Sequence, residues 1–81
     1  MELNVVCCGP LERLTGQYQL PLQLPDDATV ADVYTAIATQ FPEAQDLLTR
    51  CAVAVGSSLV GASTPLSPGD VVAILPPVAG G

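Results

Sequence analysis

The hydrophobic pattern near the start of the chain predicts two strands joined by a short helical turn. Residues 3–8 are nearly all apolar, as expected for a central strand covered on both faces. Residues 11–15 fit one helical turn, with Gly16 at its end, where a positive φ is often needed. Residues 18–24 then alternate between apolar residues and polar residues or proline. This alternation is typical of a half-buried strand, and Pro21 places that strand at a sheet edge.

A long amphipathic helix is predicted to follow. Thr29 and Asp32 have the spacing of a capping box, although Asp replaces the usual Glu, and Pro42 ends the helical pattern. Apolar residues at helical spacing form one face, made of Val30, Val33, Tyr34, Ile37 and Phe41. A second, short helical segment is expected at residues 44–48.

Three more strands are predicted in the second half of the chain, at residues 51–55, 59–60 and 71–75. Two strands, one long helix and then short strands is the element order of the β-grasp fold. This is an α+β architecture in which about five short strands form a mixed sheet packed on one main helix. The first and last strands then lie parallel in the middle of the sheet, and the helix covers only one face.

The last predicted strand is apolar on both sides. Val71, Ala73 and Leu75 would point to one face of the sheet, and Val72 and Ile74 to the other. Since the helix covers only one face, either loops or a partner protein must cover the second face. We favour the partner, because this surface adjoins the C-terminal segment.

The composition limits what kind of protein this is. The chain has 81 residues, of which 49% are hydrophobic and 12% charged, so it can form one ordered domain and is not an ordinary disordered chain. No apolar run approaches the roughly 18 residues of a membrane span, and the start lacks the basic residues of a secretory signal. We therefore expect a cytoplasmic protein that binds no membrane, with a folded domain at residues 1–75 and a flexible tail at residues 76–81.

Acidic residues dominate the charge of the chain. The formal net charge is −6, from eight acidic residues against Arg13 and Arg50, and the sequence has no lysine. A chain without a basic patch cannot neutralise phosphates, which argues against nucleic acid as a partner. The acidity predicts partners with basic surfaces, or it serves solubility alone.

The three cysteines, Cys7, Cys8 and Cys51, are predicted to be small buried hydrophobic residues. An odd number of cysteines in a cytoplasmic chain argues against a disulfide framework. Cys7 and Cys8 would point to opposite faces of one strand, so they cannot jointly bind a metal. The sequence has no histidine for a mixed zinc site or a Cys-His nucleophile. We expect no metal site.

The C-terminal residues carry the most specific signal in the sequence. Pro76 and Pro77 lack a backbone N–H and favour extended geometry, so we expect the sheet to end there and a stiff stalk to begin. They are followed by Val78, Ala79, Gly80 and Gly81. A terminal α-carboxylate on Gly81 would sit on a thin thread that can enter another protein's active site. At ~3.3–3.6 Å per residue, the tail would reach on the order of 20 Å from the domain.

Three short motifs follow one another near the end of the chain: Thr64-Pro65-Leu66, Gly69-Asp70 and the run from Pro76 to Gly81. In order and spacing they resemble the Pro-Leu, Gly-Asp and Pro-Pro-Val-x-Gly-Gly motifs of the MoaD family, the ubiquitin-like sulfur-carrier subunits of molybdopterin synthase. Residues 11–16 more weakly resemble a Leu-Arg-Glu turn of that family, and length and element order agree. The chain departs at Gly56, where members often have Asn, and at Leu75, where they often have an aromatic residue.

The resemblance implies a sulfur carrier for molybdenum cofactor biosynthesis that is not an enzyme by itself. An activating enzyme similar to ubiquitin E1 enzymes would use ATP to adenylate Gly81, and a sulfur-donating enzyme would convert the adenylate to a thiocarboxylate. The tail would then enter the large synthase subunit, in a heterotetramer of two small and two large subunits, and give sulfur to cyclic pyranopterin monophosphate. Leu59 and Leu75 would form the docking face for the large subunit, and the carrier would bind no cofactor itself.

Three alternatives remain open. A ThiS-like carrier for thiamine or cysteine synthesis would share the fold and the Gly-Gly end, although the Pro-Pro-Val-x-Gly-Gly pattern argues against it. A protein modifier would form isopeptide bonds with target lysines, and its own lack of lysine would prevent lysine-linked chains. An interaction module would have an inert tail.

Overall fold

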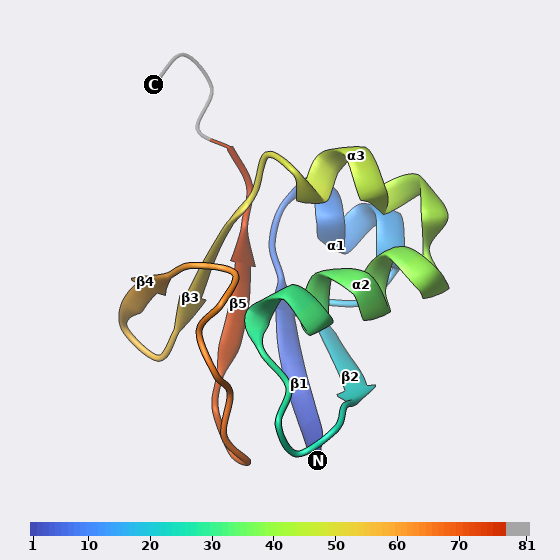
Figure 1. Cartoon of the computed structure of the whole chain (residues 1–81). Coiled ribbons are helices and arrows are strands. Elements are labelled where there is room, and N and C mark those ends of the chain that lie inside the picture. The colour runs from blue at the N-terminus through green and yellow to red at the C-terminus, as the bar shows by residue number, and fades with distance from the viewer. Residues whose placement is uncertain (78–81) are drawn as a thin grey trace.

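The computed structural model describes residues 1–77 and contains a five-stranded sheet with the helices packed on one side (Figure 1). In chain order the elements are β1 (Glu2–Cys7), α1 (Pro10–Thr15), β2 (Gln19–Gln23), α2 (Val30–Gln40), the 3-10 turn η1 (Pro42–Ala44), α3 (Gln45–Leu48), β3 (Ala52–Val55), β4 (Ser58–Val60) and β5 (Val72–Leu75). Every predicted helix and strand is present, with ends that differ by at most one residue.

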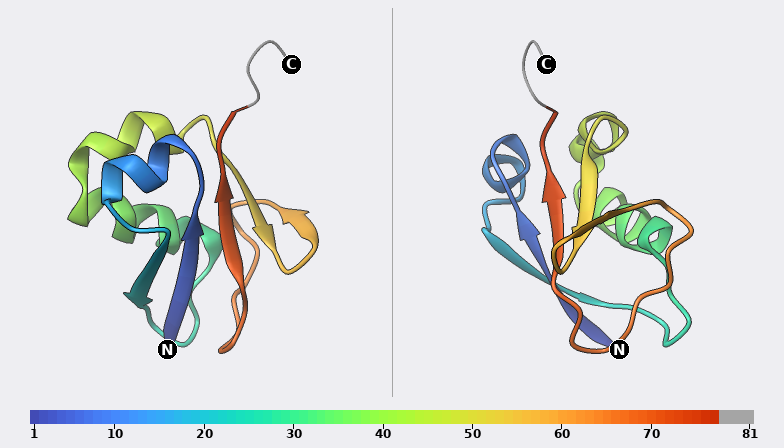
Figure 2. Two further views of the ribbon diagram at one scale, coloured as in Figure 1. Left: turned by 180° about the vertical axis from the view of Figure 1, so that it is seen from behind. Right: turned by 90° about the vertical axis from the view of Figure 1, so that its left-hand side faces the viewer.

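The strand order across the sheet is β2-β1-β5-β3-β4. Strands β1 and β5 pair in parallel, and all other neighbours pair antiparallel. The first and last strands therefore lie side by side in the sheet, as the β-grasp order predicts, and β2 with Pro21 is an edge strand. The view from behind shows α1, α2 and α3 together on one side of β5, β3 and β4 (Figure 2, left). The fold is the β-grasp fold of ubiquitin-like proteins.

The hydrophobic core lies between the helices and one face of the sheet. Helix α2 contributes Val30, Val33 and Ile37, all at most 1% exposed. The strands contribute Leu3, Val5, Cys7, Leu20, Leu22, Val53, Val72 and Ile74. Each fully buried Val, Leu or Ile stabilises the fold by roughly 1.5–3 kcal/mol. The alternation along β1, β2 and β5 thus decides which face meets the helices.

The ends of α2 follow the predicted signals. The backbone N–H of Thr29 donates to Asp32 Oδ2 at 2.8 Å, the contact expected of a capping box, so Asp serves here in place of Glu. At the other end, Phe41 donates its N–H to the Ile37 carbonyl at 2.8 Å, and Pro42 begins the next turn because it cannot continue the helix.

Three details of the sequence prediction are wrong. Residues 3–8 are not covered on both faces, because Asn4 is exposed and Val6 is half-buried although β1 is central. Tyr18 precedes β2 and is 56% exposed, so the buried alternation begins only at Leu20. Of the cysteines only Cys7 is buried, whereas Cys8 and Cys51 are half-buried.

Among residues 1–77, no helix is long and apolar enough to cross a membrane.

Candidate functional site

The face of the sheet that lies opposite the helices is incompletely covered, and it is apolar over β5, β3 and β4. On β1 and β2 the same face carries the polar residues Glu2, Asn4, Gln19 and Gln23. Two of its large side chains, Leu59 and Val71, are 71% and 60% exposed. The apolar residues of this face come from four strands and the residues next to them, and we call them together the open sheet face: Val6, Cys8, Ala52, Ala54, Leu59, Val71, Ala73 and Leu75.

The pairing register aligns four of these residues in one row across the sheet. Val6 pairs with Ala73, Ala73 pairs with Ala54, and Ala54 pairs with Leu59. Paired residues on neighbouring strands point to the same face. The row is therefore a continuous apolar band from β1 to the edge strand β4.

A second row lies nearer the end of β5. Leu75 pairs with Ala52, and Cys8 directly follows Cys7, which pairs with Ile74. Cys8 thus comes level with Leu75 on the neighbouring strand. Because the alanines are small, a partner can approach the strands closely between the larger side chains of Leu59 and Leu75. A surface of this shape is typical of a protein-protein docking face.

The first part of the loop after β4, residues 61–66, does not cover the open sheet face, because it packs on the helix side. Val30 donates its N–H to the Thr64 carbonyl at 3.1 Å, and Leu66 donates its N–H to the Ala28 carbonyl at 3.0 Å. The Leu66 side chain is 4% exposed and belongs to the core. The sequence left two possibilities for covering the face opposite the helices, loops or a partner protein. This part of the loop does not cover it.

The C-terminal segment begins at the edge of the open sheet face. Leu75 is the last residue of β5 and is half-buried, Pro76 is half-buried, and Pro77 is exposed. The predicted threading residues Val78, Ala79 and Gly80, and the predicted reactive residue Gly81, lie outside the described residues. Leu59 and Leu75, the two predicted docking residues, lie on the same face, separated by β3.

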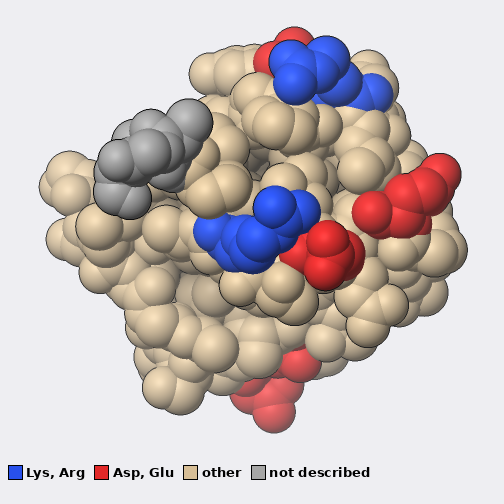
Figure 3. Space-filling view, turned by 90° about the horizontal axis from the view of Figure 1, so that it is seen from above, with Lys and Arg blue, Asp and Glu red and all other residues tan. Residues whose placement is uncertain are grey.

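Both basic side chains of the chain lie at the end of the molecule where β5 ends. Figure 3 looks down on this end and shows the two arginines, Arg13 and Arg50, among acidic neighbours. Arg50 pairs with Asp46 at 3.3 Å across one helical turn. Glu2 and Asp70, by contrast, lie at the starts of β1 and β5, at the opposite end. The excess negative charge is therefore not evenly distributed.

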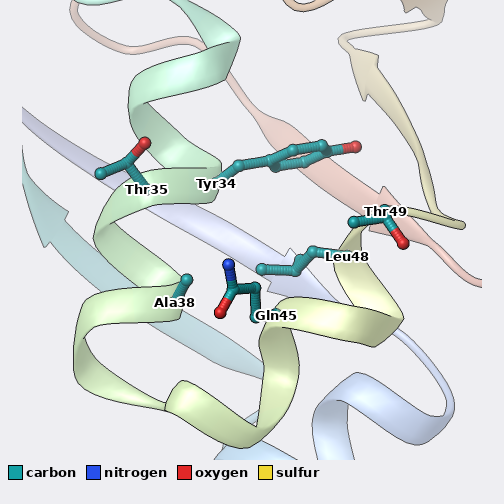
Figure 4. Close-up of a pocket in the computed structure, with 6 residues that line it drawn as sticks. All are labelled: Tyr34, Thr35, Ala38, Gln45, Leu48 and Thr49. Atoms are coloured by element: carbon teal, nitrogen blue, oxygen red, sulfur yellow. The ribbon is translucent and has the colours of Figure 1, made fainter.

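The described surface has several hollows. One of about 180 Å³ lies between α2 and α3, lined by Tyr34, Thr35, Ala38, Gln45, Leu48 and Thr49 (Figure 4). The Tyr34 hydroxyl donates to the Cys51 carbonyl at 3.1 Å, so it has a structural role there. Burial raises the pKa of the Tyr34 hydroxyl and of the Cys51 thiol. Neither group is activated as a nucleophile at neutral pH.

Residues 1–77 contain no cluster of three or more His, Cys, Asp or Glu side chains that could hold a metal ion. Burial likewise raises the pKa of the Cys7 thiol, which keeps it protonated and unreactive. The described residues provide an apolar surface and the end of β5, from which the C-terminal segment continues.

Sequence reasoning missed part of the open sheet face. It identified Leu59, Leu75 and the apolar side of β5, but not Val6, Cys8, Ala52 or Ala54. The sequence signal for these residues was present, because alternate residues of the apolar segments 3–8 and 51–55 must point to the face opposite the helix. The register that brings these residues beside Ala73 and Leu75 is a property of the sheet and cannot be seen in a single segment.

Comparison with protein families matches residues 5–81 to the model of the ThiS family. Among solved structures, the protein-protein complex of subunits 1 and 2 of the molybdopterin-converting factor from Helicobacter pylori 26695 contains a chain 29% identical to this one. The TM-score is 0.70, and the alignment covers 100% of both chains.

Two further structures show the same fold at lower identity. A putative molybdopterin converting factor subunit 1 from Pyrococcus furiosus is 23% identical, with a TM-score of 0.88 over 96% of this chain and 99% of that one. Small archaeal modifier protein 1 (SAMP1) from Haloferax volcanii is 20% identical, with a TM-score of 0.88 over 100% of both chains. The match over residues 5–81 shows that the chain belongs to the ThiS family and has the ubiquitin-like fold of its sulfur carriers.

Proposed function

We propose that this protein is the sulfur carrier of a molybdopterin synthase, and that its reactive group is the α-carboxylate of Gly81. The observation that carries the proposal is the position of Leu75, which belongs to the open sheet face and directly precedes Pro76. A partner that docks on this face also meets the start of the Pro-Pro-Val-x-Gly-Gly segment. Docking of the partner would therefore also bring the C-terminal segment to it.

A large subunit is the proposed occupant of the open sheet face. The Helicobacter pylori relative, at 29% identity, was solved as a complex of subunits 1 and 2 of the molybdopterin-converting factor. Interface centres are apolar and depleted of charge, and the apolar residues of the open sheet face are contiguous in the sheet and bordered by the polar side chains of Asn4 and Gln19. We propose that Leu59 and Leu75 are its main anchors, in an assembly of two small and two large subunits.

The proposed chemistry begins with activation of the terminus. A carboxylate is a poor acyl donor, so an E1-like enzyme would join a Gly81 oxygen to the α-phosphorus of ATP and release pyrophosphate. A sulfur-donating enzyme would then supply hydrosulfide, whose sulfur attacks the acyl carbon while AMP leaves. The product is a thiocarboxylate, in which one terminal oxygen has been replaced by sulfur.

Sulfur transfer would follow in the large subunit. The thiocarboxylate sulfur would bond to a carbon of cyclic pyranopterin monophosphate as a C–O bond at that carbon breaks. Water would then hydrolyse the resulting thioester, which leaves the sulfur on the pterin and releases the carrier as its carboxylate. The carrier brings its terminus and its docking face, whereas the acid, base and binding groups belong to the partner. The protein is therefore proposed as a sulfur-donor subunit that binds no cofactor of its own and is not an enzyme alone.

Two other functions remain among the alternatives considered above, a sulfur carrier for another pathway and a protein modifier, and each must be distinguished from the proposed one. The match to the ThiS family is compatible with a carrier that gives its sulfur to another pathway. The structural similarity to a small archaeal modifier protein, at 20% identity, extends to the fold and leaves open a role in isopeptide formation. A modifier would use the same adenylation but would form an amide with a target lysine.

The test is reconstitution with the large subunit from the same cells. The thiocarboxylate form of the protein and the large subunit, incubated with cyclic pyranopterin monophosphate, should produce molybdopterin, and the unmodified carboxylate form should not. If both forms are inactive while a thiazole-forming or cysteine-forming system consumes the thiocarboxylate, the carrier serves that pathway. If protein conjugates form in place of either product, the chain is a modifier.

A further inference from the structure

Gly9 lies directly beneath Pro76, at the point where the C-terminal segment leaves the sheet. A Cβ atom placed on Gly9 would lie 3.4 Å from Cγ and 3.8 Å from Cβ of Pro76. For a methyl group these distances are ordinary van der Waals contact, so any side chain larger than methyl at position 9 would have to share its space with the proline ring. No other atom outside the neighbouring residues comes as close to that position.

The contact is a consequence of how β1 and β5 end. The two strands run in parallel and finish together, since Cys7 pairs with Ile74. The chain after β1 must then turn away to start α1 at Pro10, whereas the chain after β5 continues past it. The turning residue, Gly9, therefore faces the continuing residue, Pro76.

The backbone of Gly9 makes this turn in a conformation that suits glycine alone. Its φ is 60° and its ψ is −126°, which other L-residues rarely adopt, and its carbonyl accepts the N–H of Arg13 at 3.3 Å. Three other described glycines have positive φ, but a Cβ on Gly16, Gly56 or Gly69 would meet nothing within 4 Å. Gly9 therefore differs from these glycines in having Pro76 as a neighbour as well as in its backbone conformation.

We propose that Gly9 is a positioning residue for the C-terminal segment: because it has no side chain, the Pro76 ring can lie over position 9, and this placement sets the direction in which the segment leaves the open sheet face. The inference rests on the proposed function, because direction matters only if the terminus must reach a reaction site. Proline lacks backbone freedom at φ, so fixing its ring also fixes the next peptide unit. A side chain larger than methyl at position 9 would need the space of that ring and would turn the segment aside.

Two variants test this arrangement, and one control shows the effect of the same side chain at another glycine with positive φ. Gly9→Val adds atoms toward Pro76, and Pro76→Ala removes the ring from the other side without changing the turn. Gly16→Val puts the same side chain on a glycine that also has positive φ, 75°, but has open space around it. If Gly9→Val fails to fold, Pro76→Ala still tests the proposal, because Pro76 lies outside the hydrophobic core.

The structural readout needs no partner. The protein should show a nuclear Overhauser effect between Gly9 Hα and the Pro76 ring protons, and the residual dipolar coupling of the Val78 N–H should change in Gly9→Val and Pro76→Ala but not in Gly16→Val. Absence of the Overhauser effect, or an unchanged coupling in both test variants, would overturn the proposal.

The functional readout is ATP–pyrophosphate exchange by the activating enzyme. Misdirection of a reacting group by about 1 Å can reduce rates by up to about 100-fold, so both test variants should lower kcat at least about tenfold. KM should stay within about twofold, because the substitutions change where the terminus points and leave the rest of the protein surface unaltered. Equal kcat in all variants, or a loss confined to KM, would contradict a positioning role. If the unaltered protein supports no exchange, the proposed function fails, while the Overhauser effect and the coupling still decide whether the contact sets the direction.

Discussion

Leu59 and Leu75 lie on the same face of the sheet, across β3 from each other. Leu59 pairs with Ala54 and Leu75 pairs with Ala52, and these two alanines are two residues apart on one strand. The two leucines therefore stand diagonally on either side of a flat alanine surface. A single partner surface can contact both, which makes each one a test of the proposed docking face.

Leu75→Glu should weaken binding to the large subunit by about 2–4 kcal/mol, because it places a charge in an apolar interface that excludes water. The isolated protein should keep its fold, since Leu75 is only half-buried and lies outside the core. Thr35→Glu is the matched control: it adds the same charge on the exposed side of α2 and should leave the affinity unchanged. Titration calorimetry measures both. Equal affinity of the Leu75→Glu variant and the unaltered protein would place docking elsewhere.

The rate of association with the large subunit should fall as salt rises from ~0.05 to ~0.5 M. The net charge of −6 favours approach to a positive surface, and the Debye length shrinks from ~14 to ~4 Å over this range. The dissociation rate should stay nearly constant, because apolar contacts hold the complex. Stopped-flow mixing separates the two rates. An association rate that is insensitive to salt would mean that the acidity serves solubility.

Most of the fold was predictable from the sequence because its signals are local. The capping residues Thr29 and Asp32, the helix stop at Pro42 and the positive φ of Gly16 all act within a few residues. Tyr18 was placed wrongly because alternation indicates faces but not where burial starts. Burial at that point depends on where the neighbouring elements end.

The docking face could be predicted only in part. Leu59 and the outward side of β5 are visible as apolar residues in short segments, but their meeting with Val6 and Ala54 depends on the pairing of distant strands. The contact of Gly9 with Pro76 has the same origin. A Gly-Pro dipeptide in the sequence indicates a turn, and nothing local shows what will pack on it.

Stability should decrease at alkaline pH. Burial raises the pKa of the Cys7 and Cys51 thiols above the ordinary value of 9.0, and that of the Tyr34 hydroxyl above 10.0. Because the unfolded chain then loses these protons first, stability is fully present below pH about 9 and falls as the pH rises above it. Urea unfolding between pH 7 and 11 measures the slope.

Cys7→Ala tests the cause of this slope. The variant should lose about 1 kcal/mol at neutral pH, because the buried side chain becomes smaller, but its stability should depend less on pH above 9. Cys8→Ala is the control, since Cys8 is half-buried outside the core. A slope that is the same in Cys7→Ala and the unaltered protein would show that the other groups cause it.

Deleting Gly81, or adding one residue after it, should abolish sulfur transfer in the reconstituted synthase. The proposed chemistry needs a free α-carboxylate at one fixed reach, so both variants misplace it. The free energy of unfolding should change by less than about 0.5 kcal/mol, as is usual for changes at a chain end. Full activity of the extended variant would show that the terminus is not the reacting group.

The most direct test of the central claim is the intact mass of the protein after incubation with ATP, its activating enzyme and a sulfur donor. The protein should end at Gly81 and gain about 16 Da, the difference between the sulfur of a thiocarboxylate and the oxygen that it replaces. The gain should disappear when ATP is omitted. A mass that stays unchanged with all components present, or that appears only as conjugates to other proteins, would contradict the assignment of a sulfur carrier.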